Sequence, residues 1–265
     1  MATLPFFVIP TPLGTVTSGN ELSTNPGSHL GEFDAAGMTW RGSGTSNTYV
    51  RGDFGSAKEI DFAAMLAGNA GSSDQFRLKL GDSQAEVDGT ADYDSGLINF
   101  INPTISRSDG LYHSHLSMGT AYTKRWWRFN MSVAATFEAA FLILGKRLTP
   151  ANWYSPGFGF GVNDKAKAEI SPHRLIERIP GQKTRTVSFR LGWMSEQEME
   201  ETWRPFDEIV GTSSPVFCCF DPTSNTYRQN RTFFGLLSEN PYARQVVTTA
   251  SGPRFERSFE IESLI

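Results

Sequence analysis

Histidine and cysteine are scarce in this chain, whose 265 residues include only 4 His and 2 Cys. These side chains supply most zinc and copper ligands and the strongest protein nucleophile, so little is available to build a metal cage or a thiol enzyme. The sequence also lacks a glycine-rich phosphate-binding loop and a Gly-x-Ser-x-Gly nucleophile elbow. We therefore expect no cofactor, no metal and no catalytic activity, and we predict a protein that binds or assembles.

Excess basic charge and long apolar runs are also missing. The net charge is -4 and the pI is about 5.6, which argues against a nucleic-acid partner because phosphate binding needs clustered base. The short basic run of Lys124, Arg125 and Arg128 is predicted to lie on solvated strand or loop edges. No stretch approaches the about 18 consecutive apolar residues of a membrane helix, and residues 1–5 carry no basic secretory leader. We expect neither membrane insertion nor secretion.

The two cysteines are neighbours, Cys218 and Cys219, within an apolar run. Adjacent residues of a strand point to opposite faces, so a disulfide between them would be strained. We predict a buried strand with reduced thiols.

Aromatic residues and glycine, by contrast, are abundant, with 20 Phe, 6 Trp, 7 Tyr and 25 Gly. Apolar residues alternate with polar ones in 59–66 and most cleanly in 76–80, whereas 137–144 is apolar enough for a buried central strand. About eight such short strands, separated by turns, are typical of a sandwich or jelly roll. The sequence predicts a mainly β protein whose N-terminal jelly-roll β-sandwich covers residues 1–148.

A loop rich in Gly, Pro and aromatic residues at 148–162 marks the predicted boundary of a second β domain, 149–265. This domain carries one short helix at about 196–210. Ser195 followed by Glu198 forms a capping box at its start. An apolar stripe then runs along the helix, formed by Met199, Trp203, Phe206 and Val210. Pro205 is expected to break or kink the helix after Trp203, and Gly211 is expected to end it.

The last strand, 255–261, alternates between an apolar face and an acidic face. Its acidic face predicts a half-exposed strand at the edge of a sheet, where unpaired backbone groups are open to another chain. We therefore predict a subunit interface at Phe255, Phe259 and Ile261.

The first half of the chain resembles a known family. The resemblance rests on a series of segments: MTWRG at 38–42, VRGDFG at 50–55, IDFAAMLAGN at 60–69, FRLKL at 76–80 and WWRF at 126–129. In this order and spacing they are similar to the discoidin-like, galactose-binding jelly rolls found in bacteriophage tail proteins. The resemblance covers residues 30–148 and implies a module that either binds glycans or serves as a structural platform.

The second half resembles the C-terminal region of phage distal tail and minor tail proteins. The similar segments are FRL at 189–191, SPVFCCFDP at 214–222 and RTFFGLL at 231–237. Such proteins form rings, usually hexameric, between tail tube and baseplate, which implies a tail-tube-like β-sandwich or barrel here. In many of them the ring-forming domain comes first, whereas here the jelly roll comes first unless residues 1–30 complete the second domain.

The resemblance implies sugar-binding candidates among aromatic and polar side chains at one end of the jelly roll. These candidates are Trp40, Asp109, His113, His115 and Trp126, with Trp127 considered beside Trp126. Because Trp126 and Trp127 face opposite sides of a strand, one of the two is expected to be core.

Three catalytic or metal-binding alternatives have weaker support. His113 and His115 share a strand face near Asp109 and offer metal ligands, but a third ligand is unspecified. Asp92 and Asp94 are a candidate glycosidase pair, although carboxylates are common in turns. A Ser-His-Asp site has no sequence support, because Ser114 and Ser117 lie near histidines only through adjacency and no Gly-x-Ser-x-Gly is present.

Together these observations predict a structural virion component at the distal end of a long-tailed phage, made in the host cytoplasm. Its predicted partners are copies of itself in a ring, the tail tube, hub and fibres, and a host surface glycan. The alternative is a soluble, lectin-like carbohydrate-binding module.

Overall fold

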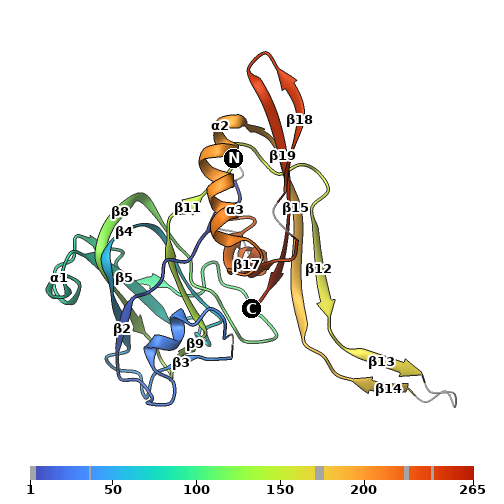
Figure 1. Cartoon of the computed structure of the whole chain (residues 1–265). Coiled ribbons are helices and arrows are strands. Elements are labelled where there is room, and N and C mark those ends of the chain that lie inside the picture. Colours follow the sequence, from blue (N-terminus) through green and yellow to red (C-terminus); the bar gives the residue numbers. More distant parts are fainter. Residues whose placement is uncertain (1–3, 36, 171–175, 224–226, 240–241) are drawn as a thin grey trace. The chain divides into compact units, whose positions relative to one another are not determined.

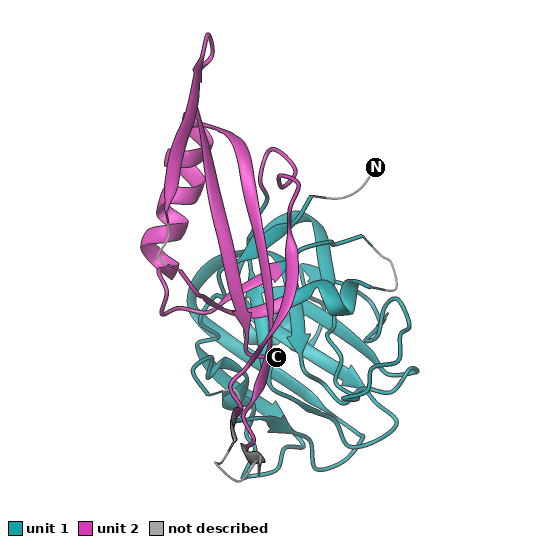
Figure 2. Cartoon of the chain, turned by 90° about the vertical axis from the view of Figure 1, so that its right-hand side faces the viewer, with its two compact units in different colours: residues 1–149, 219–232 teal, residues 150–218, 233–265 magenta. Residues whose placement is uncertain are grey.

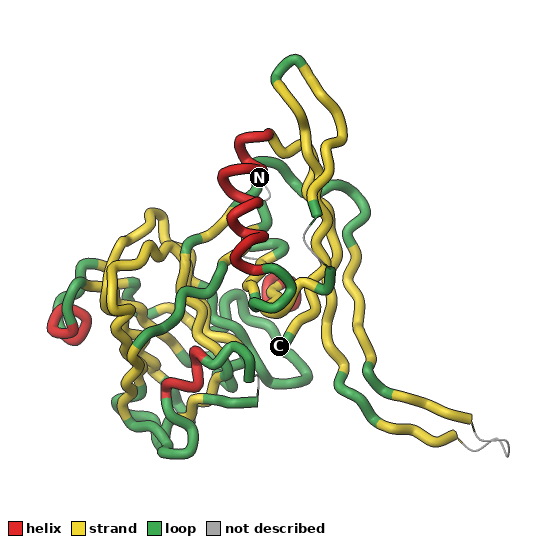
Figure 3. Tube along the Cα trace, viewed as in Figure 1, coloured by secondary structure: helices red, strands yellow, loops and turns green. Residues whose placement is uncertain are grey.

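The computed structural model describes residues 4–35, 37–170, 176–223, 227–239 and 242–265. Within these residues there are nineteen strands and only short helical segments. Figures 1 and 3 show how these elements follow one another along the chain. The mainly β fold class is confirmed. No helix among the described residues is both long and apolar enough to span a membrane.

The chain divides into two compact units, coloured separately in Figure 2. Unit 1 comprises residues 1–149 and 219–232, and unit 2 comprises residues 150–218 and 233–265. The segment 219–232 therefore belongs to the first unit, although it lies inside the predicted second domain of 149–265. The roles assigned to the two predicted domains stay predictions.

Unit 1 is built on a seven-stranded antiparallel sheet. Its strands are, in order, β10 (Phe141–Gly145), β4 (Tyr49–Leu66), β8 (Leu116–Ser132), β5 (Gln75–Gly81) and β6 (Tyr93–Asp94), with β2 (Thr15–Gly19) beside β4 and β7 (Ile98–Asn99) beside β5. Two small ladders and three short helices complete the unit: β1 (Phe6–Val8) with β11 (Arg147–Leu148), β3 (Trp40–Arg41) with β9 (Glu138–Ala139), α1 (Gln84–Asp88), and the 3-10 helices η1 (Gly27–Gly31) and η3 (Arg228–Arg231).

The alternation in β5 and β8 turns one face of this sheet toward the core. Phe76 of β5 stacks on Phe129 of β8 with ring centroids 5.0 Å apart. Trp127 is fully buried and its indole N–H donates to the carbonyl of Leu13 at 3.2 Å. The opposite face of the same strands carries polar side chains and does not face the core.

Strand β4 is longer than the alternation in the sequence predicts. Residues 49–66 form one continuous strand, of which the alternation marks only 59–66. Gly55 adopts φ 77°, and the register between β4 and β8 shifts between Asp53 and Lys58, so the ladder accommodates this glycine as an irregularity.

Unit 2 is one antiparallel sheet with a helix on one face. Its strands are, in order, β16 (Val216–Cys219), β17 (Thr232–Leu237), β19 (Gly252–Ser263), β15 (Lys183–Ser195) and β12 (Gly159–Asp164), with β18 (Ala243–Thr249) also paired to β19. The β18–β19 hairpin and the two-stranded ladder of β13 (Lys167–Ile170) and β14 (Ile176–Ile179) extend from the sheet, as Figure 1 shows. Cys218 and Cys219 are buried in β16 and form no disulfide, as predicted, and burial raises the pKa of the Cys219 thiol to about 12.

The predicted helix is present over the expected residues, as α2 (Glu196–Glu198), the π-helical turn η2 (Met199–Trp203) and α3 (Arg204–Val210). The Ser195 hydroxyl accepts the N–H of Glu198 at 3.1 Å, which confirms the cap. Instead of a break, the π-helical turn precedes Pro205, whose missing N–H makes a regular α-helical bond impossible there. Gly211, at φ 52°, ends the helix.

The prediction that the last strand lies at a sheet edge was wrong. β19 pairs with β15 on one side and with β17 and β18 on the other, so its backbone groups are already used within the chain. Phe259 and Ile261 are buried, and Phe259 packs against Trp203 of the helix at 5.5 Å. Only Phe255 keeps partial exposure. Apolar and polar residues do alternate along β19, as predicted, but its apolar face packs against the helix and is not open to another chain.

Candidate functional site

The predicted sugar-binding residues do not form one surface. Trp40 is fully buried in the core of unit 1, with its ring 5.8 Å from that of Phe137. The His115 ring lies 4.9 Å from Phe62 and 5.8 Å from Phe6. Its burial, together with nearby arginine charges, lowers the pKa of His115 well below its usual value. Trp40 therefore packs the core, whereas the partly buried His115 packs against the two phenylalanine rings.

Asp109 and His113 are brought together by Arg107, a residue that no sequence pattern predicted. The Asp109 carboxylate accepts two hydrogen bonds from the Arg107 guanidinium, at 2.7 and 3.1 Å, and these lower the pKa of Asp109. His113 is buried; its Nδ1 accepts the N–H of Ala67 at 3.1 Å, and its Nε2 lies 3.3 Å from an Arg107 nitrogen. With Nδ1 engaged and a cation beside Nε2, His113 is poorly suited to bind a metal.

Trp126 and Trp127 take opposite faces of β8, as expected. Trp127 is core, whereas Trp126 is half-buried on the polar face, in register with Asp53 of β4 and Gly81 of β5. Trp126 is thus the predicted candidate that lies on the polar face of the sheet.

The candidate catalytic groups are occupied by structural contacts. The buried Ser114 hydroxyl accepts the N–H of Met65 at 2.7 Å. Asp92 forms an ion pair with Lys124, and Asp94 forms one with Arg77. Each of these two carboxylates is thus paired with a cation of the chain.

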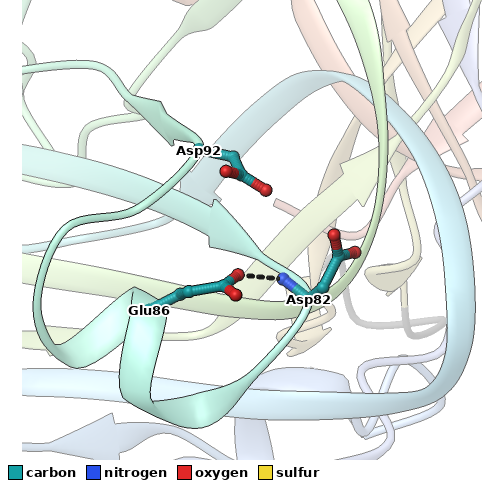
Figure 4. Close-up of side chains that lie close together, drawn as sticks. All are labelled: Asp82, Glu86 and Asp92. Atoms are coloured by element: carbon teal, nitrogen blue, oxygen red, sulfur yellow. Dashed lines mark hydrogen bonds between the residues drawn. The ribbon is translucent and has the colours of Figure 1, made fainter.

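A cluster of three carboxylates, Asp82, Glu86 and Asp92, lies close enough together to suggest a cation site (Figure 4). Glu86 accepts the backbone N–H of Asp82 at 2.6 Å. The ammonium of Lys124 donates to Asp82 at 2.8 Å and also to Asp92, and these bonds raise its pKa. A protein cation already serves this cluster, so it is an ion-pair network.

A different site lies on the polar face of the unit 1 sheet. A shallow cavity of about 280 Å³ opens there. Six of its lining residues offer charge, hydrogen-bonding groups or apolar surface to a ligand: Arg77, Lys79, Asp88, Leu97, Arg128 and Asn130. They come from β5, β8, the end of α1 and the residue before β7, which the ladder fixes side by side.

The strand register places three cations in one row across this face. Arg51 of β4 is directly opposite Arg128 of β8, and Arg128 is directly opposite Lys79 of β5. Asn130 lies in the next row, between Tyr49 and Arg77.

Asp88 is the carboxylate that serves this row. It lies 2.5 Å from both Arg51 and Arg128. Burial alone would raise the pKa of Asp88, but hydrogen bonds from Arg51 and Arg128 outweigh it and the pKa is lowered. The Lys79 ammonium instead donates to the carbonyl of Gly89 at 2.6 Å.

The cavity offers hydrogen-bond donors and acceptors beside an apolar rim. Arginine and lysine donate, the Asp88 carboxylate accepts, and the Asn130 amide does both. Leu97, 57% exposed, supplies the apolar surface. Sequence patterns placed Arg128 only in a solvated basic run and did not predict this site. The available signal was the polar positions of the alternation at 76–80.

No protein-family model matches the chain, and no curated protein matches it. Among solved structures, a chitosan-binding module from a Paenibacillus chitosanase/glucanase has 11% identity and TM-score 0.36, covering 51% of this chain and 97% of its own. A Streptococcus pneumoniae fucose-binding module has 9% identity and TM-score 0.38, covering 52% and 95%. A fucolectin from striped bass serum has 12% identity and TM-score 0.37, covering 97% and 92%.

Proposed function

We propose that the protein is a non-catalytic carbohydrate-binding protein whose unit 1 holds a glycan in the cavity of the β5–β8 face. The observation that carries the proposal is the lining of that cavity. Sugar hydroxyls both donate and accept, so they fit a surface where guanidinium, amide and carboxylate groups stand side by side. The exposed Leu97 provides a contact for the C–H face of a sugar ring.

Glycan-array binding by the full chain, followed by calorimetry on any sugar that binds, tests the proposal. The informative variant is Asn130→Ala, because Asn130 lies inside the cavity and its carbonyl accepts a 2.7 Å bond from Arg128. Thr123→Ala, an exposed position on the same strand, is the matched control. The proposal expects Asn130→Ala to weaken sugar binding and Thr123→Ala to leave it unchanged. An array with no bound sugar would refute it.

A second candidate function is self-association through unit 2. The specific observation is a free, apolar sheet edge: among the described strands β12 pairs only with β15, and Phe160 and Val162 on it are 50% and 64% exposed. β18, paired only with β19, is the opposite free edge of this part of the sheet. Edges of this kind invite another strand, and joining β12 of one copy to β18 of the next makes a head-to-tail contact that can close into a ring.

The more specific form of this second proposal is that the associated copies form the ring scaffold at the distal end of a phage tail, bound to tube, hub and fibres. Its support is the sequence resemblance described above. Light scattering and negative-stain microscopy of the purified protein test association: rings, or a mass several times 29.3 kDa, are expected. Val162→Lys should abolish them, and Ile209→Lys, at a helix position 60% exposed, should not. Monomers that persist at high concentration, and absence from purified phage particles, would contradict this candidate.

A further inference from the structure

The row formed by Arg51, Arg128 and Lys79 works against the stability of the sheet. Like charges directly opposite one another on neighbouring strands repel, and here three cations face one another across three strands. Burial strengthens the repulsion, because the side chains of Arg51 and Arg128 are only 14% and 18% exposed. A local arrangement that costs stability is expected where function requires it.

The carboxylates of the chain neutralise this face only in part. Asp88 serves Arg51 and Arg128, and Asp94 serves the neighbouring Arg77. Among the described residues no carboxylate forms an ion pair with Lys79, whose ammonium contacts a neutral carbonyl.

This face therefore has a surplus of two positive charges. Its cations are Arg51, Arg77, Lys79 and Arg128, and its carboxylates are Asp88 and Asp94. The surplus is local, because the chain as a whole carries -4. A long polyanion such as nucleic acid would extend beyond the cavity and be repelled by the net negative charge of the chain. A small ligand with one anionic group would meet only the cavity.

We infer that the cavity binds the oxyanion of an acidic sugar, a carboxylate or a sulfate, through Lys79, Arg77 and Arg128. Guanidinium groups match the planar geometry of carboxylates, and an ammonium adds a point charge beside them. Asn130 and Leu97 remain for the hydroxyls and the ring. This inference rests on the proposed carbohydrate-binding function and names the ligand class of that site.

Calorimetry on the full chain tests it with three disaccharides of the same linkage: one carrying a glucuronate, one carrying a sulfate, and the neutral parent. We expect at least one acidic sugar to bind about tenfold or more tightly than the neutral parent, with affinity that falls as salt rises. The two acidic probes distinguish a carboxylate ligand from a sulfate ligand.

Lys79→Gln removes the cation that lacks a carboxylate partner and keeps a donor for the Gly89 carbonyl. It should weaken acidic-sugar binding about tenfold and weaken neutral-sugar binding by a smaller factor, because only the acidic sugar loses a charge partner. Lys146→Gln is the matched control, since Lys146 is an exposed lysine paired with Glu59 outside the cavity. Asn130→Asp is the second variant, which adds a negative charge to the cavity if Lys79→Gln fails to fold.

The outcomes separate the two claims. Equal binding of neutral and acidic sugars, lost in Asn130→Ala, would overturn the inference and leave the proposed function standing. Acidic-sugar binding untouched by both Lys79→Gln and Asn130→Asp would also overturn it, because the sugar would then bind elsewhere. Absence of binding by any sugar would overturn the proposed function itself.

Discussion

Replacing Asp88 with asparagine should lower the stability of the protein and raise its affinity for acidic sugars. Asp88 is the last residue of α1, and its carboxylate is shared by Arg51 and Arg128 at 2.5 Å each. Asparagine has nearly the same shape, but its neutral amide can accept from one guanidinium while its NH₂ group faces the other. The substitution therefore removes the negative charge and leaves the cationic row uncompensated.

The expected loss of stability follows from these two contacts. A hydrogen bond to a charged group contributes roughly 1.5–3 kcal/mol. The Asp88 side chain is 31% exposed, so solvent screening reduces the total. We expect Asp88→Asn to lower the free energy of unfolding by about 2 kcal/mol, measured by urea denaturation at pH 7. Glu59→Gln, which breaks the more exposed pair with Lys146, is the control and should cost less than about 1 kcal/mol.

The sign of the pH dependence is fixed by the lowered pKa of Asp88. A carboxyl whose folded pKa lies below its unfolded value of about 3.9 stabilises the fold fully above that pH. The contribution disappears as pH falls through the folded pKa. The difference between natural protein and Asp88→Asn should therefore be constant near neutrality and vanish in acid.

The same substitution should increase the affinity for acidic sugars. Without Asp88 the cavity carries one more uncompensated positive charge, so acidic sugars should bind more tightly to the folded variant in calorimetry. Unchanged stability would show that Asp88 does not neutralise the row. A variant that folds but binds acidic sugars more weakly would refute the electrostatic argument.

Three further substitutions test the fold by urea denaturation. Ser195→Ala should lose about 1 kcal/mol, because it removes the hydroxyl that caps the helix. Asp207→Asn should cost about 3 kcal/mol, because it leaves the 1% exposed guanidinium of Arg257 uncompensated, whereas the double variant with Arg257→Met should be at least as stable as the natural chain. Gly235→Ala should destabilise the β17–β19 pairing, because the new Cβ would lie 1.8 Å from the carbonyl oxygen of Glu262. A single Asp207→Asn as stable as the natural protein, or a tolerated Gly235→Ala, would contradict these contacts.

Sequence patterns predicted the helix and the strand whose formation depends on residues close together in the sequence. The helix from Glu196 to Val210 was predictable because its cap, its apolar stripe and its terminal glycine all lie within one stretch of sequence. The reciprocal half of the capping box was not, since the Glu198 carboxylate instead accepts the indole N–H of Trp203 at 3.1 Å. The strand alternation of 76–80 was predictable for the same local reason.

Pairing between distant strands could not be predicted in this way. Whether residues 255–261 form an edge depends on β17 and β18, which lie elsewhere in the sequence. The cationic row likewise depends on register, because a shift of one residue between β5 and β8 would place Lys79 beside the core. The return of residues 219–232 to unit 1 is also a long-range effect, in which the Gln229 side chain bonds both the N–H and the carbonyl of His113.

The short segment around α1 compensates part of the cationic row. The Ser83 hydroxyl caps α1 by accepting the N–H of Glu86, and the same turn presents Asp88 to two arginines and the Gly89 carbonyl to Lys79. An acidic ligand would contact the groups that this segment already satisfies. Its affinity is therefore set by competition with Asp88, as well as by the charge of the cavity. This is why removing one carboxylate should weaken the fold and strengthen the binding at once.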